Sequence, residues 1–477
     1  MPKGSRQRVQ DAVHGLMEFA GLETSVIDVL RFPELQRLRR VRQLGLSYQV
    51  YPAAEHSRFA HALGAAYLAI RFCHQLRDAT GGFLGPLMRP DPAITRDVAL
   101  AALLHDLGHG PLSHVWERQV AGFSHADWCN AMDLEQTPAL SRLKWHELVG
   151  QGLIAWPDGP LHEHLERQEE LTSERIRHLL LGTYEVPYLP QILSSDIDVD
   201  RCDFVRRDSH MTGVAHGRYD LNWLLSTATV TADGSLFGFD ERKAPAVIEQ
   251  FLVARRALYK TVYRHKTVRS GEGLVGLFLD RLKHWLAGNP RGGPRFPFFP
   301  SYRKILLGQP LSPEELLQLD DYSLGVMIDY FQTGSDDDIL GDLARRVTSR
   351  DLLKEVDAEH DELEAFHRRR GGEEELRAEL ALQVPEGATG SYIYVEDEDD
   401  PLTYFSPLEK RGSKEGSGEI DRNQVFLIHG ASAGTLAKEH PELWSLRVSD
   451  EKEKPPPRRI FVPREALKRA GEIVRAT

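Results

Sequence analysis

Hydrophobic positions in the first three fifths of the chain recur every three to four residues, which is the period of amphipathic helices. This pattern occurs in residues 25–45, 58–82, 94–110, 173–182 and 245–288. We expect Thr95 to cap the helix that runs toward residue 110, since a threonine hydroxyl can accept a backbone N–H. We expect the last segment to be interrupted near Gly271–Gly273. Residues 234–240 ("GSLFGFD") predict one arm of a short β-hairpin.

The second part of the chain has a different pattern. The glycines and prolines of residues 288–300 forbid regular structure, and helical spacing resumes in residues 312–332 and 336–353. Short β-rich runs follow at residues 390–396, 402–407, 423–430 and 458–463, and a last helix is expected after them. We predict a mainly α protein with a helical core and a smaller C-terminal α+β region containing a short antiparallel sheet. The expected divisions are the helical core, a helical extension and the α+β region, at residues 1–287, 288–375 and 376–477.

Composition and charge narrow the class of protein. With 477 residues and 41% hydrophobic side chains, the chain has material for a large core and for two or three domains. A run of about 18 apolar residues and a secretory leader are both missing, so we expect no membrane span and no export. Three widely spaced cysteines fit a reducing cytoplasm. The net charge of −12 argues against general nucleic-acid binding.

Candidate chemistry is concentrated in "HDLGHGPLSH", residues 105–114, which directly follows the apolar run "VALAALL". His61 lies upstream inside an amphipathic segment, and three aspartates lie downstream, Asp198, Asp200 and Asp203. Imidazoles and carboxylates from several helices of one bundle are a common way to build a metal site. A single histidine on an apolar helix is more often a hydrogen-bonded core residue. The dense "HD…GHG" pattern is more specific, and it favours metal binding.

The order of His61, His105–Asp106 and Asp200 resembles the H…HD…D signature of the HD phosphohydrolase superfamily. The segments "FPELQRLRRVRQLG", "EHSRFAHALGAAYLA" and "DIDVDRCDFVRRDSHMTGV" are similar to those of the deoxynucleoside triphosphate (dNTP) triphosphohydrolases. The similarity is greatest to the branch of the vertebrate enzyme that carries a sterile-alpha-motif domain, for which we expect no counterpart here. The motifs cover about residues 10–270, and a weaker resemblance continues to the last strand and helix.

The resemblance implies metal-dependent hydrolysis of a dNTP to a deoxynucleoside and inorganic triphosphate. The implied metal ligands are His61, His105, Asp106 and Asp200. This donor set suits Fe, Mn, Zn or Ni, and Mg less well, without choosing among them. His109, Glu117 and His146 are the implied catalytic residues. His146 would protonate the leaving 5′-oxygen, with His125 as the alternative, and Glu117, where the family usually has aspartate, would orient it.

The resemblance also implies how the substrate is held. Arg58, His114, Arg201 and Arg255 are expected to contact the triphosphate, while Gln43, Asp208 and Tyr263 are expected to recognise the deoxyribose. Phe204 stands where the family often has tyrosine, so a hydroxyl that would touch phosphate is missing.

A regulatory nucleotide site is the last feature that the resemblance implies. Gln36, Arg39, His265 and Lys266 match residues of an activator site between subunits, so we expect a homo-oligomer, a dimer or a tetramer. Arg31 replaces an aspartate that reads guanine in the vertebrate enzyme, which argues against a guanine-specific activator. Two other functions stay open: another HD-type nucleotide phosphohydrolase or phosphodiesterase, and a nucleic-acid-binding regulatory protein. The metal set and the sugar-reading residues favour the dNTP triphosphohydrolase.

Overall fold

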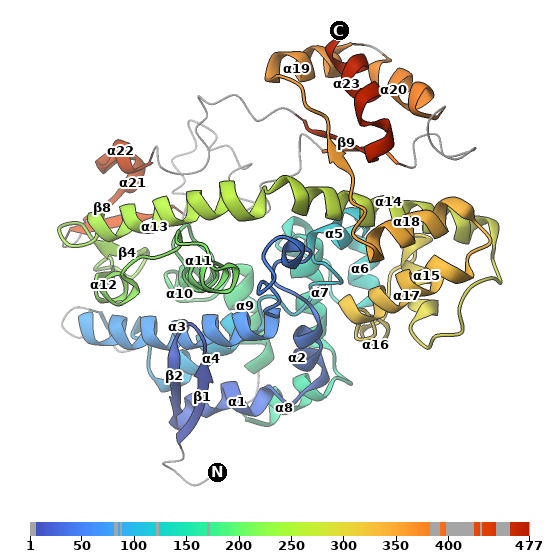
Figure 1. Ribbon diagram of the computed structural model, residues 1–477. Helices are drawn as coiled ribbons and strands as arrows, with labels where there is room; N and C mark the ends of the chain where they lie inside the picture. The colour runs from blue at the N-terminus through green and yellow to red at the C-terminus, as the bar shows by residue number, and fades with distance from the viewer. Residues whose placement is uncertain are drawn as a thin grey trace.

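The predicted fold class, mainly α, is confirmed in the computed structural model (Figure 1). The structure describes residues 6–80, 84–85, 88–120, 124–168, 172–369, 371–381, 392–396, 424–429, 432–444 and 458–476. Within these ranges, the helices lack any apolar stretch of the length needed to cross a membrane. Helices α19 (His360–Arg368), α20 (Gly372–Ala381) and α23 (Leu467–Arg475) are grouped with strand β9 (Ile460–Val462), apart from the main helical body (Figure 1).

The centre of the helical body is formed by α3 (Arg58–Ala79), α4 (Pro92–Leu104) and α11 (Val199–Thr212), with α3 packed against both of the others. Helix α4 begins earlier than the sequence predicts. Asp91 is its N-cap and accepts the backbone N–H of Ile94, whereas Thr95 is buried inside the first turn. An aspartate followed directly by a proline at the first helical position is the stronger start signal.

Short helices surround this centre, and several of them replace one long predicted helix. Residues 25–45 form α1 (Ser25–Val29), α2 (Pro33–Arg37) and a 3₁₀ turn, because Pro33 starts a new helix at its first position. The other helices of the body are α5 (His114–Val120), α6 (His125–Ala131), α7 (Trp145–Ala155), α8 (Pro160–Gln168), α9 (Thr172–Leu181), α10 (Leu189–Leu193), α12 (Leu221–Ser226), α15 (Phe299–Leu306), α16 (Pro313–Leu316), α17 (Asp321–Gly334), α18 (Asp338–Thr348), α21 (Leu436–Glu439) and α22 (Pro441–Trp444).

The long segment 245–288 is interrupted at a different place from the one predicted. Helix α13 (Pro245–Leu258) passes into a π-helical turn, and α14 (Lys266–Gly288) then runs without a break through both glycines. A methyl group at Gly273 would lie 2.2 Å from the ring of Tyr394. These glycines therefore allow close packing against α14 instead of ending it.

Strands form three small sheets. The antiparallel hairpin of β1 (Arg6–Asp11) and β2 (Gly15–Ala20) was not predicted. The predicted hairpin arm is β4 (Phe237–Asp240), which pairs with β3 (Ala228–Val230). Their sheet continues through β7 (Phe426–His429), parallel to β4, and β8 (Ser432–Thr435). The expected antiparallel sheet at the C-terminus consists of β5 (Lys354–Glu355), β9 and β6 (Tyr394–Val395). The β-rich run at residues 402–407 lies outside the described residues.

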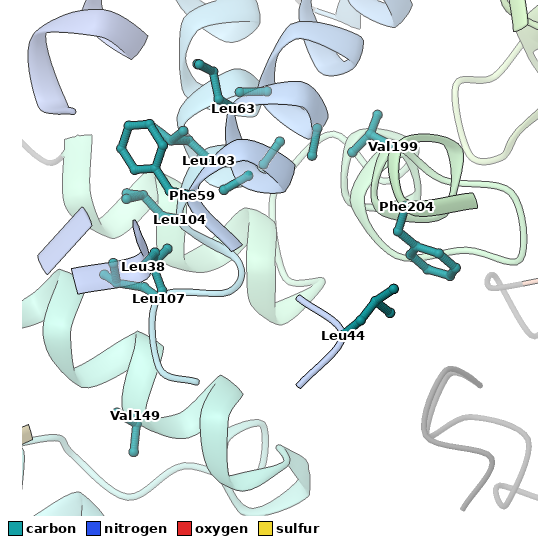
Figure 2. Close-up of a cluster of buried hydrophobic side chains, with 14 of the residues drawn as sticks. Leu38, Leu44, Phe59, Leu63, Leu103, Leu104, Leu107, Val149, Val199 and Phe204 are labelled. Carbon is teal, nitrogen blue, oxygen red and sulfur yellow. The ribbon is translucent and has the colours of Figure 1, made fainter. Parts of the chain in front are cut away.

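One apolar core extends through the helical body and surrounds the end of α4. Figure 2 shows Leu103 and Leu104 near Phe59 of α3 and Leu107 beside Leu38, while Phe204 extends from α11. A second, smaller cluster holds α19, β9 and α23 together. The "HDLGHG" segment thus leaves α4 from inside a rigid core.

Gly64 of α3 tests how closely α3 and α11 must approach. A methyl group there would lie 2.0 Å from Asp203 Oδ1 and 2.5 Å from Arg207 Nη2, so Gly64→Ala should lower the free energy of unfolding by about 1–3 kcal/mol. In α14, Gly276 has nothing within 4 Å of such a methyl group, and Gly276→Ala is the matched control, expected to be neutral or to stabilise by up to about 1 kcal/mol. Urea unfolding measures both, and equal stabilities would contradict the close approach.

Candidate active site

The two glycines of "HDLGHG" permit the loop after α4 to lie against neighbouring elements. A methyl group at Gly108 would lie 2.0 Å from the backbone oxygen of His146, and one at Gly110 would lie 2.2 Å from the Trp116 ring. Neither glycine has a positive φ. Close contact with α7 therefore explains Gly108, and this contact brings His146 beside the loop.

A buried arginine holds the same loop by its carbonyl groups. The Arg37 guanidinium donates to the oxygens of Leu107 at 2.6 Å, His109 at 2.7 Å and Leu319 at 3.0 Å. Burial lowers the pKa of Arg37 to about 10, so the group stays charged at neutral pH. One side chain thus joins the loop to the segment that leads into α17.

Asp321, at the start of α17, fixes the next turn of the loop. Its carboxylate accepts the backbone N–H groups of Leu112 at 2.7 Å and Arg42 at 2.9 Å. Leu112 and Ser113 have φ values of 51° and 47°, which cost energy for residues other than glycine. The buried hydrogen bonds from Asp321 hold this strained turn, which places His114 at the start of α5.

The predicted metal ligands lie together at the end of α4. His61 Nε2 is 3.0 Å from Asp200 Oδ1 and 3.4 Å from His105 Nε2. Asp106 Oδ1 is 3.2 Å from His105 Nε2, and Asp106 Oδ2 is 3.7 Å from His61 Nε2. The structure therefore gathers two imidazole nitrogens and two carboxylates from α3, α11 and the loop.

Both imidazoles are oriented from their other nitrogen. His61 Nδ1 donates to Asp203 Oδ2 at 2.8 Å, and His105 Nδ1 donates to the Ala102 oxygen at 2.7 Å. In each case Nε2 faces the group of ligands. Donors at right angles around an ion with bonds of about 2.1 Å lie about 3 Å apart, so this set fits a divalent ion of the Fe, Mn, Zn or Ni type.

Asp203 connects this group to the N-terminal hairpin. It accepts hydrogen bonds from His14 Nε2 at 2.7 Å and from Arg207 Nε at 2.8 Å, and Arg207 also pairs with Asp11 at 3.0 Å. Sequence reasoning included Asp203 only as a possible ligand and did not identify His14 or Arg207. The signal was the i, i+3 spacing of Asp200 and Asp203, which places them one turn apart on α11.

Asp198 has a structural role in α11. It is the N-cap, accepting the backbone N–H groups of Arg201 at 2.8 Å and Ser195 at 3.0 Å, and its carboxylate pairs with the Arg201 guanidinium. Asp200 is the aspartate that reaches His61. The capping function explains why the two aspartates, two positions apart, differ in role.

The electrostatics of the group favour a bound cation. Burial lowers the pKa of His61, but its hydrogen bonds to Asp200 and Asp203 raise that pKa to about 10. Burial raises the pKa of Asp106, while Arg58 and His105 lower it to well below its usual value. The carboxylates are therefore charged at neutral pH, and they stabilise positive charge between them.

Three histidines converge on the single carboxylate of Glu117. His146 Nδ1 donates to Glu117 Oε1, His109 Nδ1 lies 3.4 Å from the same atom, and His114 Nδ1 lies 3.3 Å from Oε2. The rings of His109 and His146 stack with centroids 3.9 Å apart. Burial raises the pKa of Glu117, but His146 and His114 lower it by more, so that the pKa lies well below its usual value. Glutamate thus reaches the histidine for which the family uses the shorter aspartate.

His109 and His114 differ from His61 in their preferred charge state. Burial lowers the pKa of His109 well below its ordinary value, and the nearby Arg58 lowers it further. Burial also lowers the pKa of His114. Both are neutral at pH 7, so they can donate hydrogen bonds to phosphate without adding charge.

A cavity of about 160 Å³ connects two sets of side chains. One is the metal-type group, which consists of the four predicted ligands His61, His105, Asp106 and Asp200. The other is the Glu117 cluster, which consists of Glu117 and the three histidines around it. Residues predicted from sequence line the cavity: Gln43, Arg58, His105, Asp106, His109, His114, His146, Asp200, Arg201 and Phe204. Sequence reasoning missed other lining residues, among them Lys144, Glu147, Gln151 and Ser194. Arg58 Nη1 donates to Asp106 Oδ2 at 2.6 Å, so this arginine both holds a metal-type ligand and faces the cavity.

Three predicted substrate residues do not line this cavity. The Asp208 carboxylate accepts hydrogen bonds from Tyr263 at 2.7 Å and from His56 at 2.8 Å. Tyr263 packs edge-to-face on Phe204 with centroids 6.3 Å apart, so it lies just behind a lining residue. Arg255 is buried in α13.

His125 and the expected activator residues lie elsewhere. His125 Nε2 donates to the oxygen of Leu143 at 2.6 Å; Leu143 lines the cavity, whereas His125 does not. Gln36 accepts a hydrogen bond from Arg39 at 3.1 Å, and the Arg39 guanidinium lies over the Phe59 ring. His265 and Lys266 begin α14, a different element.

The chain was also compared with proteins of known sequence and structure. No family model matches the chain. The uncharacterized protein YwfO of Bacillus subtilis is 29% identical over 86% of this chain and 84% of its own length. The deoxynucleoside triphosphate triphosphohydrolase SAMHD1 is 30% identical in Xenopus laevis and 28% identical in Homo sapiens, over 54% of this chain in each case. The matches cover 42% of those two proteins, so this chain corresponds to less than half of their length.

A solved structure shows the same fold over nearly the whole chain. A phosphohydrolase from Bacteroides thetaiotaomicron aligns with a TM-score of 0.69 and 24% identity, covering 96% of this chain and all of that one. Fold and sequence together define the class that the chain resembles: its fold is that of a solved phosphohydrolase, and its sequence is similar to that of a deoxynucleoside triphosphate triphosphohydrolase. Within that class, the predicted resemblance to the dNTP triphosphohydrolases is confirmed.

Substitutions distinguish the predicted metal ligands from Asp203, which orients the ligand His61, by their effect on metal binding. The double variant His105→Ala, Asp106→Ala removes two donors and should abolish stoichiometric metal binding. Asp203→Asn keeps all four donors but weakens the acceptor that orients His61, so affinity should fall about 10- to 100-fold. Metal titration by calorimetry measures both.

Circular dichroism of each variant serves as the folding control for this comparison. Full metal affinity in a folded double variant would show that the ion binds elsewhere, and unchanged affinity in Asp203→Asn would remove the orienting role.

Proposed function

We propose that the protein hydrolyses deoxynucleoside triphosphates to a deoxynucleoside and inorganic triphosphate, with a divalent metal at His61, His105, Asp106 and Asp200. One observation carries this proposal: the metal-type group and the Glu117–histidine cluster share one cavity. Attack at the α-phosphorus needs a polarised phosphate oxygen, and departure of the 5′-oxygen needs a proton donor. The cavity offers groups suited to both requirements.

The charge of the lining supports a metal-dependent reaction. Four carboxylates line the cavity, Asp106, Glu147, Asp198 and Asp200, against three cationic side chains, Arg58, Lys144 and Arg201. By formal charge the lining repels a polyphosphate, whereas a divalent cation reverses the sign. When bound, such an ion polarises a phosphate oxygen and lowers the pKa of water.

The protein's own residues have distinct tasks in this mechanism. Water adds to the α-phosphorus and gives up a proton as the bond from phosphorus to the 5′-oxygen breaks. Protonated His146 gives its proton to that oxygen, and the proton released by water restores the imidazolium. Glu117 accepts the Nδ1–H of His146, so the opposite nitrogen, Nε2, is the one that carries the proton to be transferred. His109 stacks on the His146 ring and limits its rotation.

Recognition of deoxyribose is the second part of the proposal. The side-chain oxygen of Gln43 is buried and has no hydrogen-bond partner among the described residues, although Gln43 lines the cavity. A buried amide oxygen gains from a donor such as the sugar 3′-hydroxyl. Tyr263 and Asp208 stand behind Phe204, and they are proposed to limit the space for a 2′-hydroxyl.

Product analysis tests the proposed reaction. The metal-loaded protein, given each dNTP alone and in mixtures, should release deoxynucleoside and triphosphate in equal amounts, and ribonucleotides should react more slowly. Ion-exchange chromatography resolves the products. Release of orthophosphate would instead favour another HD-type nucleotide phosphohydrolase.

The same assay addresses activation and assembly. We infer from the resemblance that Gln36, Arg39, His265 and Lys266 bind an activating nucleotide between the subunits of an oligomer. Activity that appears only in mixtures, together with a nucleotide-dependent rise in molecular mass, supports this inference. Equal activity with each nucleotide alone would contradict the inference of an activator site.

His146→Ala should retain the metal and slow hydrolysis by about 10²- to 10⁴-fold, since it removes the proton donor while leaving the ligands in place. The matched control is His125→Ala, because His125 does not line the cavity and its Nε2 is bonded to the backbone oxygen of Leu143. Single-turnover rates and metal content measure the two effects. Loss of metal from His146→Ala, or a larger rate loss in His125→Ala, would overturn the assignment.

A further inference from the structure

We infer that Lys144 binds the phosphates beyond the α-phosphate, and so makes the cavity selective for a triphosphate chain. The inference rests on the proposed function and deepens it. Lys144 precedes α7, lines the cavity and is half-buried. No sequence motif pointed to it, because a single lysine before a helix has no distinguishing pattern.

Lys144 differs from the other cations of the cavity in its partners. Arg58 donates to Asp106 and to Ser113, and Arg201 is paired with Asp198. The Lys144 ammonium forms no hydrogen bond or ion pair with any residue that the structure describes. Both arginines thus have charge committed to carboxylates, whereas the ammonium charge of Lys144 is left for an anionic ligand.

The position of this ammonium matches the far end of a polyphosphate. It lies near enough to His114 for its charge to lower the pKa of that imidazole. His114, Lys144, Asp106 and Asp200 all line the cavity. His114 contacts Glu117 at 3.3 Å, whereas Asp106 and Asp200 contact His105 and His61. A nucleotide with its α-phosphate at the metal-type group can therefore extend its remaining phosphates toward His114 and Lys144.

The start of α7 adds to the attraction for an anion. Its first backbone N–H groups carry the partial positive charge of a helix N-terminus. The Lys144 backbone N–H donates a hydrogen bond to Glu147 Oε2 at 2.7 Å, which fixes the lysine at the N-terminus of the helix. The N-terminus of α7 therefore lies beside the ammonium, and residues of this first turn, His146 and Glu147, line the cavity.

Binding of inorganic triphosphate and of a deoxynucleoside monophosphate to metal-loaded protein tests this inference by calorimetry. Lys144→Met should weaken triphosphate binding about 10- to 100-fold, the value of one charge-assisted hydrogen bond, and leave monophosphate binding unchanged. Lys144→Arg should keep most of the affinity. Lys243→Met is the control, because Lys243 is exposed and lies between β4 and α13, away from the cavity.

Kinetics give a second readout. With dNTP, Lys144→Met should raise KM and weaken inhibition by triphosphate, with little change in kcat. Unchanged triphosphate affinity in a folded Lys144→Met protein, or an equal loss for monophosphate, would overturn the inference. Failure of the wild-type protein to hydrolyse any dNTP would instead overturn the proposed function, while the triphosphate titration still decides the role of Lys144.

Discussion

The buried carboxylate of Asp203 is the constraint on which the site depends. A charge removed from water must be compensated by close donors, and Asp203 has three: His14 from the N-terminal hairpin, His61 from α3 and Arg207 from α11. Each donor belongs to a different element, so compensation of one charge fixes three elements relative to one another. Gly64 leaves the space in which this arrangement fits. The same hydrogen bond to His61 aims that imidazole at the metal-type group.

The "HDLGHG" loop after α4 depends on a second set of buried polar contacts. Loops carry backbone groups that must find partners when they are buried. Arg37 supplies donors to the carbonyls of Leu107 and His109, and Asp321 supplies an acceptor to the N–H of Leu112. These partners lie far from the loop in sequence, on α2 and α17. The region beyond residue 288 therefore supports the loop that carries the histidines, as well as extending the fold.

The cavity combines two electrostatic environments within a short distance. Around His61 and Asp200 the carboxylates stabilise positive charge, which suits a metal ion. Around His109 and His114 burial keeps the imidazoles neutral, which suits hydrogen bonding to phosphate. A polyphosphate that spans both environments meets the cation at one end and neutral donors with Lys144 at the other. For the proposed function, this division is the physical reason to expect cleavage at the α-phosphorus.

The sequence by itself determined the helical class, the metal-type set and the family resemblance, because periodicity and the "HD…GHG" spacing are local patterns. It also separated Asp200 from Asp198 by matching the family register, although the reason, capping of α11, is visible only in the fold. Packing decided where the helix in residues 245–288 is interrupted and that the N-terminal hairpin forms. Pro33 decided that residues 25–45 form two short helices instead of one. Tertiary structure alone brought His14, Arg37, Lys144 and Asp321 to the site. These residues act through contacts across long separations, for which a single sequence contains no local signal.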